Sequence, residues 1–167
     1  LVGSEMCIRD RYKTTKQGTV PMNSTETAKK VASKILERDK TCRSMGICLE
    51  YVNEGTATLS LEIKEQHING HGICHGGIIF TLSDSAFAFA CNSRNAASIA
   101  QHASVTFIKP AELGDKLFAT AKEISLVKRN GIYDVTVTNQ NANVIAEFRG
   151  YSRTIKGPVL KKNEKIN

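Results

Sequence analysis

Residues 69–92, NGHGICHGGIIFTLSDSAFAFACN, decide how this chain folds. After Gly76 and Gly77, neither glycine nor proline recurs until well beyond Asn92. The apolar residues of this run fall on every side of a helical wheel, and a helix that is apolar all round is normally buried. The sequence therefore predicts a long buried helix from Gly76 to about residue 93.

A single carboxylate, Asp84, interrupts the apolar run. A carboxylate midway along a buried helix is expensive to desolvate and is rarely kept without a partner or a task. Two interpretations stay open at this point. Asp84 is either a structural carboxylate held by Ser83, Ser85 or a distant lysine, or a nucleophile or general base.

The two glycines at the start of the helix offer the second chemical group. They leave backbone N–H groups unpaired where the helix dipole is positive, so Gly76 N–H is suited to an oxyanion, although a glycine pair also marks tight turns. Gly76 and Asp84 are roughly 12 Å apart along one helix axis, too far to act together on one carbonyl unless the substrate lies along the helix. We therefore expect a two-fold dimer that brings Asp84 of one subunit to Gly76 of the other.

Helix and strand patterns alternate simply along the remaining chain. A first helix is expected from Ser24 or Thr25 to about residue 39, followed by strands at 46–52 and 56–64, the second with clean alternation. Four strands follow the buried helix, at residues 98–109, 116–128, 132–140 and 144–155. Asn130-Gly131 predicts a hairpin turn and residues 141–143 a further turn. This order predicts an α+β fold with an antiparallel sheet against one long helix.

Composition limits the classes of protein to consider. The 167 residues are 41% hydrophobic and 23% charged, which suits one soluble domain. The net charge is +7, but basic residues are scattered and aromatics make up 6%, which argues against a nucleic-acid partner. No stretch predicts a membrane span. An odd number of cysteines, without a C-x-x-C pair or a secretory signal, favours a reduced, cytoplasmic setting.

Both ends of the chain are expected to lie outside the folded domain. Residues 4–11 resemble a translated sequencing-library adapter, so we expect residues 1–21 to be non-native or disordered and translation to begin at Met22. Residues 157–167 are rich in lysine and asparagine and are predicted to form a disordered tail. The domain is then residues 22–156.

A zinc site is the alternative suggested by His67, His71, Cys74 and His75. Gly70 and Gly72 break any helix that would align the first two histidines, and no second cluster of ligands follows. We therefore expect no metal site.

The motifs resemble those of a known enzyme family. NGH and HGG within residues 69–77, FTLSDSAFAFACNS at 80–93, TFIKPAELGDKLFATA at 106–121 and GIYDVTVTNQ with VIAEFRG at 131–150 are similar to the hotdog-fold acyl-CoA thioesterases of the phenylacetate pathway, the PaaI type. The resemblance covers roughly residues 34–156. It implies a hotdog fold, in which the antiparallel sheet wraps around one long central helix, and a homodimer that pairs into a homotetramer.

The resemblance also implies an activity and a set of site residues. The implied reaction is hydrolysis of an aryl-acyl-CoA, such as (hydroxy)phenylacetyl-CoA, to the free acid and CoA, without a cofactor. Asp84 would be the nucleophile or general base, Gly76 N–H would polarise the thioester carbonyl, His75 would shape the site, and Asn69 would place the water or carbonyl. At Ala100 the chain departs from relatives that carry a hydroxyl residue there.

The phosphates of CoA are expected to bind cations at the mouth of the site, and the candidates are Lys109, Lys128 and Arg129. The alternative interpretation is that these three residues are solvated side chains at strand ends.

Two other functions stay open. One is a hotdog module that binds acyl-CoA without cleaving it, which gains nothing from a desolvated Asp84. The other is an enoyl-CoA hydratase, which needs a spaced Asp and His pair, although the first histidine after Asp84 is His102, in a separate strand.

Overall fold

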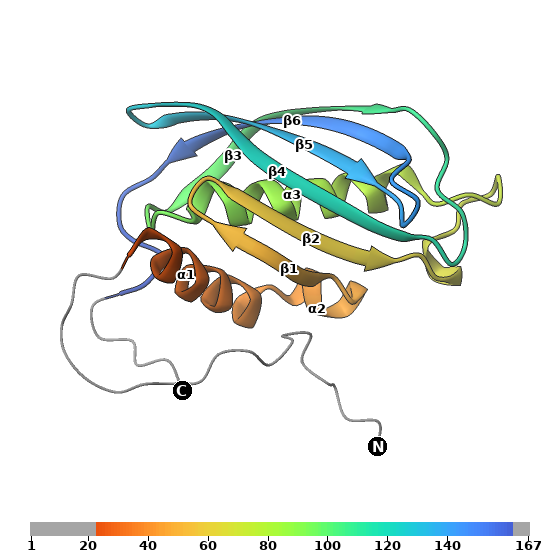
Figure 1. The fold of residues 1–167 in the computed structure, drawn as a ribbon, viewed down its shortest axis with the longest axis horizontal. Coiled ribbons are helices and arrows are strands. Elements are labelled where there is room, and N and C mark those ends of the chain that lie inside the picture. Colours follow the sequence, from red (N-terminus) through yellow and green to blue (C-terminus); the bar gives the residue numbers. More distant parts are fainter. Residues whose placement is uncertain (1–22, 162–167) are drawn as a thin grey trace, which may run out of the picture.

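The predicted order of helices and strands is confirmed by the computed structural model, which describes residues 23–161 (Figure 1). The helices are α1 (Ser24–Arg38), α2 (Lys40–Met45) and α3 (Gly76–Asn92), with a short 3-10 turn η1 (Glu65–His67). The strands are β1 (Cys48–Asn53), β2 (Thr56–Glu62), β3 (Ser98–Phe107), β4 (Lys116–Val127), β5 (Asn130–Thr138) and β6 (Val144–Thr154). The sequence did not predict α2 or η1.

All strands join one antiparallel sheet in the order β1-β2-β4-β5-β6-β3. The sheet curves around α3, which lies along its concave side, while α1 packs against β1 at one edge (Figure 1). The predicted α+β class with one long helix against an antiparallel sheet is therefore confirmed. β3 forms the opposite edge and is exposed along most of its length.

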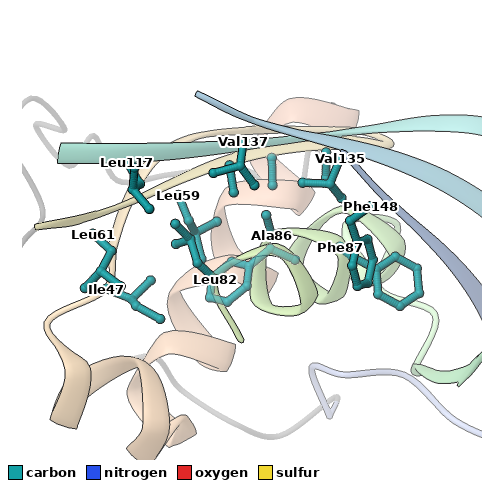
Figure 2. Close-up of a cluster of buried hydrophobic side chains, with 14 of the residues drawn as sticks. Ile47, Leu59, Leu61, Leu82, Ala86, Phe87, Leu117, Val135, Val137 and Phe148 are labelled. Carbon is teal, nitrogen blue, oxygen red and sulfur yellow. The ribbon is translucent and has the colours of Figure 1, made fainter. Parts of the chain in front are cut away.

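The core lies between α3 and the concave face of the sheet. Figure 2 shows strand side chains that point at the helix, among them Leu59, Leu117 and Val137. From the helix, Leu82, Ala86 and Phe87 meet them, and each is at most 1% exposed. Phe87 also packs edge-on against Tyr133, at 5.5 Å between ring centroids. This packing fixes which face of α3 the sheet covers.

Burial around α3 is less uniform than the sequence predicts. Gly77, Thr81, Asp84 and Ala88 form a stripe along the helix, spaced by three or four residues, that is only partly buried or exposed. We call these four residues the open stripe of α3. The sheet covers one side of the helix, and within the described residues no element fully covers the open stripe.

Two details of the strands differ from expectation. Ser60, expected on the solvent side of β2, is 2% exposed because Glu50 accepts its hydroxyl hydrogen bond at 2.6 Å.

The β4–β5 turn is formed by Lys128 and Arg129, with Lys128 at φ 56°, and Asn130 already pairs with Val127. Gly131 is instead buried in β5, where a β-carbon would lie 2.6 Å from Oγ of Ser152. It is therefore a packing glycine rather than a turn glycine.

Element ends also shift by a few residues. β1 begins at Cys48 rather than residue 46, because Gly46 adopts φ 76° and ends α2. Residues 157–161 lack helix or strand, but Leu160 N–H donates to Oδ1 of Asn95, and Gly157 O accepts from Ala97 N–H. The attached chain thus extends beyond the expected boundary at residue 156. The predicted N-terminal segment 1–21 and the remaining tail, 162–167, lie outside the described residues.

Close packing between α3 and β6 yields a stability test. A β-carbon on Gly150 would lie 2.8 Å from the ring of Phe87, which is buried and has no room to move. We expect Gly150→Ala to destabilise the fold by about 1–3 kcal/mol, the usual cost of overpacking. Urea unfolding measures this change. Gly70→Ala is the matched control, since nothing lies within 4 Å of its β-carbon; equal stability losses in both variants would contradict the packing argument.

Candidate functional site

Asp84 lies in the middle of the open stripe, half-buried and without a described partner. Within residues 23–161, no hydrogen bond or ion pair involves its carboxylate. Ser83, the first proposed structural partner, donates to Ile79 O at 2.8 Å, and Ser85 pairs with Sγ of Cys42 at 3.6 Å. The structure therefore gives no support to a structural carboxylate held by its serine neighbours.

Desolvation sets the electrostatics around this carboxylate. Burial raises the pKa of Asp84, and no cation of the described chain opposes that shift. Two turns further along α3, the pKa of the Cys91 thiol is raised to about 12, first by burial and then by the negative charge of Asp84. The Cys91 thiol thus stays protonated at neutral pH. Of these two groups on α3, the Asp84 carboxylate is therefore the candidate nucleophile or base.

At the start of α3, the backbone presents one free donor. Gly76 is the first residue of the helix, and no described residue accepts a hydrogen bond from its N–H. The next amide, Gly77 N–H, donates to Nδ1 of His75 at 2.8 Å. His75 is therefore the N-cap of the helix, and its exposed ring borders the free amide. An unpaired amide at the positive end of a helix dipole suits a developing negative charge.

Asn69 organises the loop that delivers His75. Its Oδ1 accepts from His71 N–H at 2.8 Å and from Ile73 N–H at 3.4 Å, and its own N–H donates to Ile73 O at 2.8 Å. The base of the loop is fixed by the bond from His75 N–H to His67 O at 2.8 Å. The Asn69 side chain thus shapes the loop through its oxygen.

One protomer does not bring all the predicted catalytic groups together. His75 and Gly76 lie at the first turn of α3 and Asn69 lies in the loop before it, but Asp84 lies eight residues beyond Gly76 along the same continuous helix. At about 1.5 Å per residue the separation along the axis is roughly 12 Å.

The three predicted CoA-binding cations are also dispersed. Lys109 follows β3 and borders a surface hollow that it shares with Asn139, Asn141 and Asn143. Lys128 and Arg129 form the β4–β5 turn, where Arg129 Nε donates to Thr154 O at 2.9 Å. Since β3 pairs with β6 from Ser98–Thr154 to Phe107–Ala146, these two groups lie at opposite ends of that strand pair, about 30 Å apart for ten strand residues.

Aromatic side chains near the site were only partly predictable. Phe87 and Phe89 are 1% exposed and belong to the core. Phe80 is half-buried, one turn before Asp84, and meets Phe148 edge-on at 5.4 Å. Phe107 was not predicted as a site residue, yet its ring lies against Gly76. Only the pairing of β3 places it there.

Neither a metal-ligand cluster nor a membrane-spanning helix is present within residues 23–161. In the part of the chain that the structure describes, no group of three or more His, Cys, Asp or Glu side chains could hold a metal ion. His67 is buried, and its Nδ1 accepts from Lys64 N–H at 3.1 Å. None of the described helices is long and apolar enough to cross a membrane.

Comparisons with known proteins agree with this geometry. The profile of the Thioesterase superfamily matches residues 71–146. The acyl-coenzyme A thioesterase PaaI of Escherichia coli K12 is 38% identical over 128 residues, which are 77% of this chain and 91% of that protein. The chain belongs to the PaaI-type thioesterase family. The predicted enzyme class, a thioester hydrolase, is thereby confirmed.

Solved structures confirm that this PaaI-type thioesterase has the hotdog fold. The E. coli PaaI protein, described as belonging to the phenylacetic acid degradation operon, superposes with a TM-score of 0.80 at 37% identity, covering 81% of this chain and 99% of that chain. The smu.793 protein of Streptococcus mutans, solved bound to acetyl CoA, gives a TM-score of 0.64 at 25% identity, covering 67% and 90% of the two chains.

The unpaired Asp84 yields a prediction for stability against pH. The folded-state pKa of Asp84 is raised because burial favours the neutral carboxyl group. The neutral group therefore stabilises the folded state relative to the charged one. This stabilisation is fully present below the unfolded-state pKa and is lost as the pH rises through the folded-state pKa. We therefore expect Asp84→Asn to unfold at higher urea concentration than the wild type at pH 7, and the difference to shrink as pH falls below 4, near the ordinary carboxyl pKa of about 3.9.

Asp134 provides a control of opposite sign. Its pKa is lowered because Arg149 donates two hydrogen bonds to it, at 2.6 and 2.7 Å. Asp134→Asn should lower stability at pH 7. If Asp84→Asn also lowered stability at that pH, the carboxylate would have a stabilising partner, against the structure described above.

Proposed function

We propose that this protein hydrolyses an aryl-acyl-CoA, such as (hydroxy)phenylacetyl-CoA, to the free acid and CoA. The observation that carries the proposal is Asp84, a desolvated carboxylate without a described partner, on the one face of α3 that the sheet leaves open. Partial burial of an unpaired carboxylate costs folding free energy, and a catalytic role in thioester hydrolysis would account for its presence.

In the proposed mechanism, Gly76 N–H donates a hydrogen bond to the thioester oxygen and stabilises the negative charge that develops there. Asp84 either attacks the acyl carbon itself or takes a proton from the water that does so. Collapse of the tetrahedral species breaks the carbon–sulfur bond and expels the CoA thiolate. On the water route this step gives the free acid directly, whereas direct attack leaves a mixed anhydride on Asp84 that a water molecule then hydrolyses to the free acid. A thiol has a pKa near 8.5, so the sulfur leaves without a general acid. His75 caps the first turn of α3 and shapes the site. Asn69, in the loop before the helix, helps to place the water or the carbonyl.

A second copy of the chain is needed to complete this site. β3 is an edge strand with no described neighbour on its outer side, and an exposed edge readily pairs with another strand. Antiparallel pairing of two β3 strands about a two-fold axis brings the α3 helices side by side in opposite directions, so that Gly76 of one chain approaches Asp84 of the other. The same axis brings Lys109 toward Lys128 and Arg129 of the second copy. The further pairing of dimers into a tetramer is part of the proposal.

The acyl and CoA portions of the substrate are inferred from the residues around the open stripe. Phe80 offers a half-buried aromatic ring one turn from Asp84, which supports an aryl acyl group. Lys109 is exposed and is the cation proposed to meet a phosphate of CoA. The hollow beside it is lined by Glu112 and Asp115 as well as by three asparagines, so the contact is assigned to the lysine and not to the hollow as a whole. The E. coli relative from a phenylacetic acid operon and the neighbour solved with acetyl CoA support the same substrate class.

A cytoplasmic location is part of the same proposal. Cys42, Cys74 and Cys91 are buried, and none of these three cysteines forms a disulfide. Free, largely buried thiols suit a reducing compartment.

The role of Asp84 is tested by substitution and pH. We expect Asp84→Asn to lower kcat for phenylacetyl-CoA hydrolysis by about 10²- to 10⁴-fold, the range for loss of a catalytic base. In the wild type, kcat/KM should rise with pH as Asp84 loses its proton, with a midpoint above the ordinary aspartate pKa because burial raises it. Thiol release measures both quantities.

Asp134→Asn serves as the matched control and should keep wild-type turnover, because Asp134 lies on the outer face of the sheet. Retention of binding without cleavage by the wild type would instead identify a non-catalytic acyl-CoA-binding module. Full turnover in Asp84→Asn would remove Asp84 from the mechanism.

Sharing of the site between two chains predicts complementation. Gly76→Pro deletes the N–H donor at the first helical position, where the backbone tolerates proline, and the extended backbone of His75 (ψ 131°) suits a following proline. The β-carbon of the proline requires the half-exposed ring of Phe107 to turn aside. Gly76→Pro and Asp84→Asn should each be inactive alone. Co-expressed, they should recover about a quarter of wild-type kcat, since half of the random dimers are mixed and each has one intact site of two.

Two differently tagged copies allow the mixed dimer to be isolated and its activity measured directly. Light scattering and thermal melts of each variant confirm that it still folds and assembles. No recovery in an isolated, folded mixed dimer would place Gly76 and Asp84 of the same chain in one site.

A further inference from the structure

Phe107, the last residue of β3, lies directly against the carbonyl-polarising glycine. A β-carbon built on Gly76 would lie 2.9 Å from Cζ of Phe107 and 3.3 and 3.4 Å from its two Cε atoms. These are the three nearest atoms, leaving aside the chain neighbours and the nearby backbone of the helix itself. The aromatic ring therefore fills the space that any side chain at position 76 would take.

The backbone around Phe107 fixes the direction of this ring. Phe107 faces Ala146 in the β3–β6 pair, and residues directly opposite one another project from the same side of a sheet. Ala146 is buried, so Phe107 also points to the concave side, toward α3. Ile108 N–H and Lys109 N–H both donate to Ile145 O, at 2.8 and 3.2 Å, which holds the strand end in place.

Only part of the ring is used in this packing. Phe107 is 50% exposed although it points to the concave side of the sheet. The part of the ring that does not lie against Gly76 or the strands is open to solvent. Phe107 is thus in contact with the donor without being part of the main core.

Apart from the hydrogen bonds of the helix, which its carbonyl oxygen enters, the other contacts of the first turn do not hold Gly76 itself. His75 Nδ1 accepts from Gly77 N–H, and His75 N–H donates to His67 O. Gly76 has no side chain, its N–H has no acceptor among the described residues, and glycine is the residue with the greatest backbone freedom. Lateral contact from the Phe107 ring is what restricts its movement toward β3.

We propose that Phe107 is a positioning residue for the oxyanion donor: its ring packs on the α-carbon of Gly76 and keeps the N–H aimed at the thioester oxygen. This inference rests on the proposed thioesterase function. An oxyanion donor acts only over a narrow range of distance and direction, and a displacement of about 1 Å can cost on the order of 10²-fold in rate. The contact is made by a distant strand, so its strength depends on ring size at position 107.

Kinetics of Phe107 variants test the positioning role. We expect Phe107→Ala to lower kcat by about 10- to 100-fold while KM changes by less than about threefold, the pattern of an interaction made in the transition state. Phe107→Leu, which keeps a large apolar side chain, should recover most of the lost kcat. Ile108→Ala is the matched control, because Ile108 is the next residue and is 52% exposed, and it should leave kcat unchanged.

A double-variant cycle tests whether the effect passes through Gly76. Gly76→Ala keeps the N–H but drives its methyl group into the ring; since the ring is half exposed it can turn aside, so the variant should fold and show a lowered kcat. In Gly76→Ala with Phe107→Ala the methyl group meets no ring. The double variant should therefore have the kcat of Phe107→Ala alone, rather than the product of the two losses.

The outcomes separate this inference from the proposed function. Absence of acyl-CoA hydrolysis by the wild-type enzyme would refute the function itself. Hydrolysis by the wild type, with losses that multiply in the double variant, would show that Phe107 acts independently of Gly76. A raised KM with unchanged kcat in Phe107→Ala would make the ring a substrate-binding wall, and poor kcat in a folded Phe107→Leu would exclude positioning by size; each result overturns the inference.

Discussion

Packing of one face of α3 into the concave side of the sheet is the constraint on which the rest of the molecule depends. Leu82, Ala86 and Phe87 must meet strand side chains, and this fixes the rotation of the helix about its axis. Once that rotation is fixed, Asp84 has to lie on the opposite side, on the open stripe. The energetic gain of the core thus holds an ionisable group in a position that is unfavourable for the carboxylate alone.

Much of the fold could be predicted from local patterns in the sequence. Strict alternation in β2 and the unbroken apolar run of α3 are strong signals because many residues share one periodicity. α2 was missed because six residues are too few to show a helical period. The β4–β5 turn was misplaced because the Asn130-Gly131 pair resembles a hairpin turn, whereas Gly131 is required by its contact with Ser152 across the sheet. Such contacts between distant residues leave no local pattern.

The candidate site shows the same division. The chemical types and spacing of Gly76 and Asp84 could be read from the sequence, and the site shared between two chains that this spacing suggests stays a prediction. The absence of a described partner for Asp84 could not, because Ser83 and Ser85 were equally plausible partners until their hydrogen bonds to Ile79 and with Cys42 were located. Phe107 could not be predicted as a site residue for a related reason. It lies 31 residues from Gly76 in the sequence, and only the pairing of β3 with β6 brings the two together.

The composition of β3 has a consequence for the newly made chain. Its ten residues, SIAQHASVTF, contain no lysine, aspartate or glutamate and no proline, the features that normally prevent one exposed strand from templating onto another. Lys109 and Pro110 follow only after the strand has ended. A newly made monomer therefore exposes a strand edge that can pair with other chains, and high expression should promote aggregation through β3 unless the proposed dimer forms first.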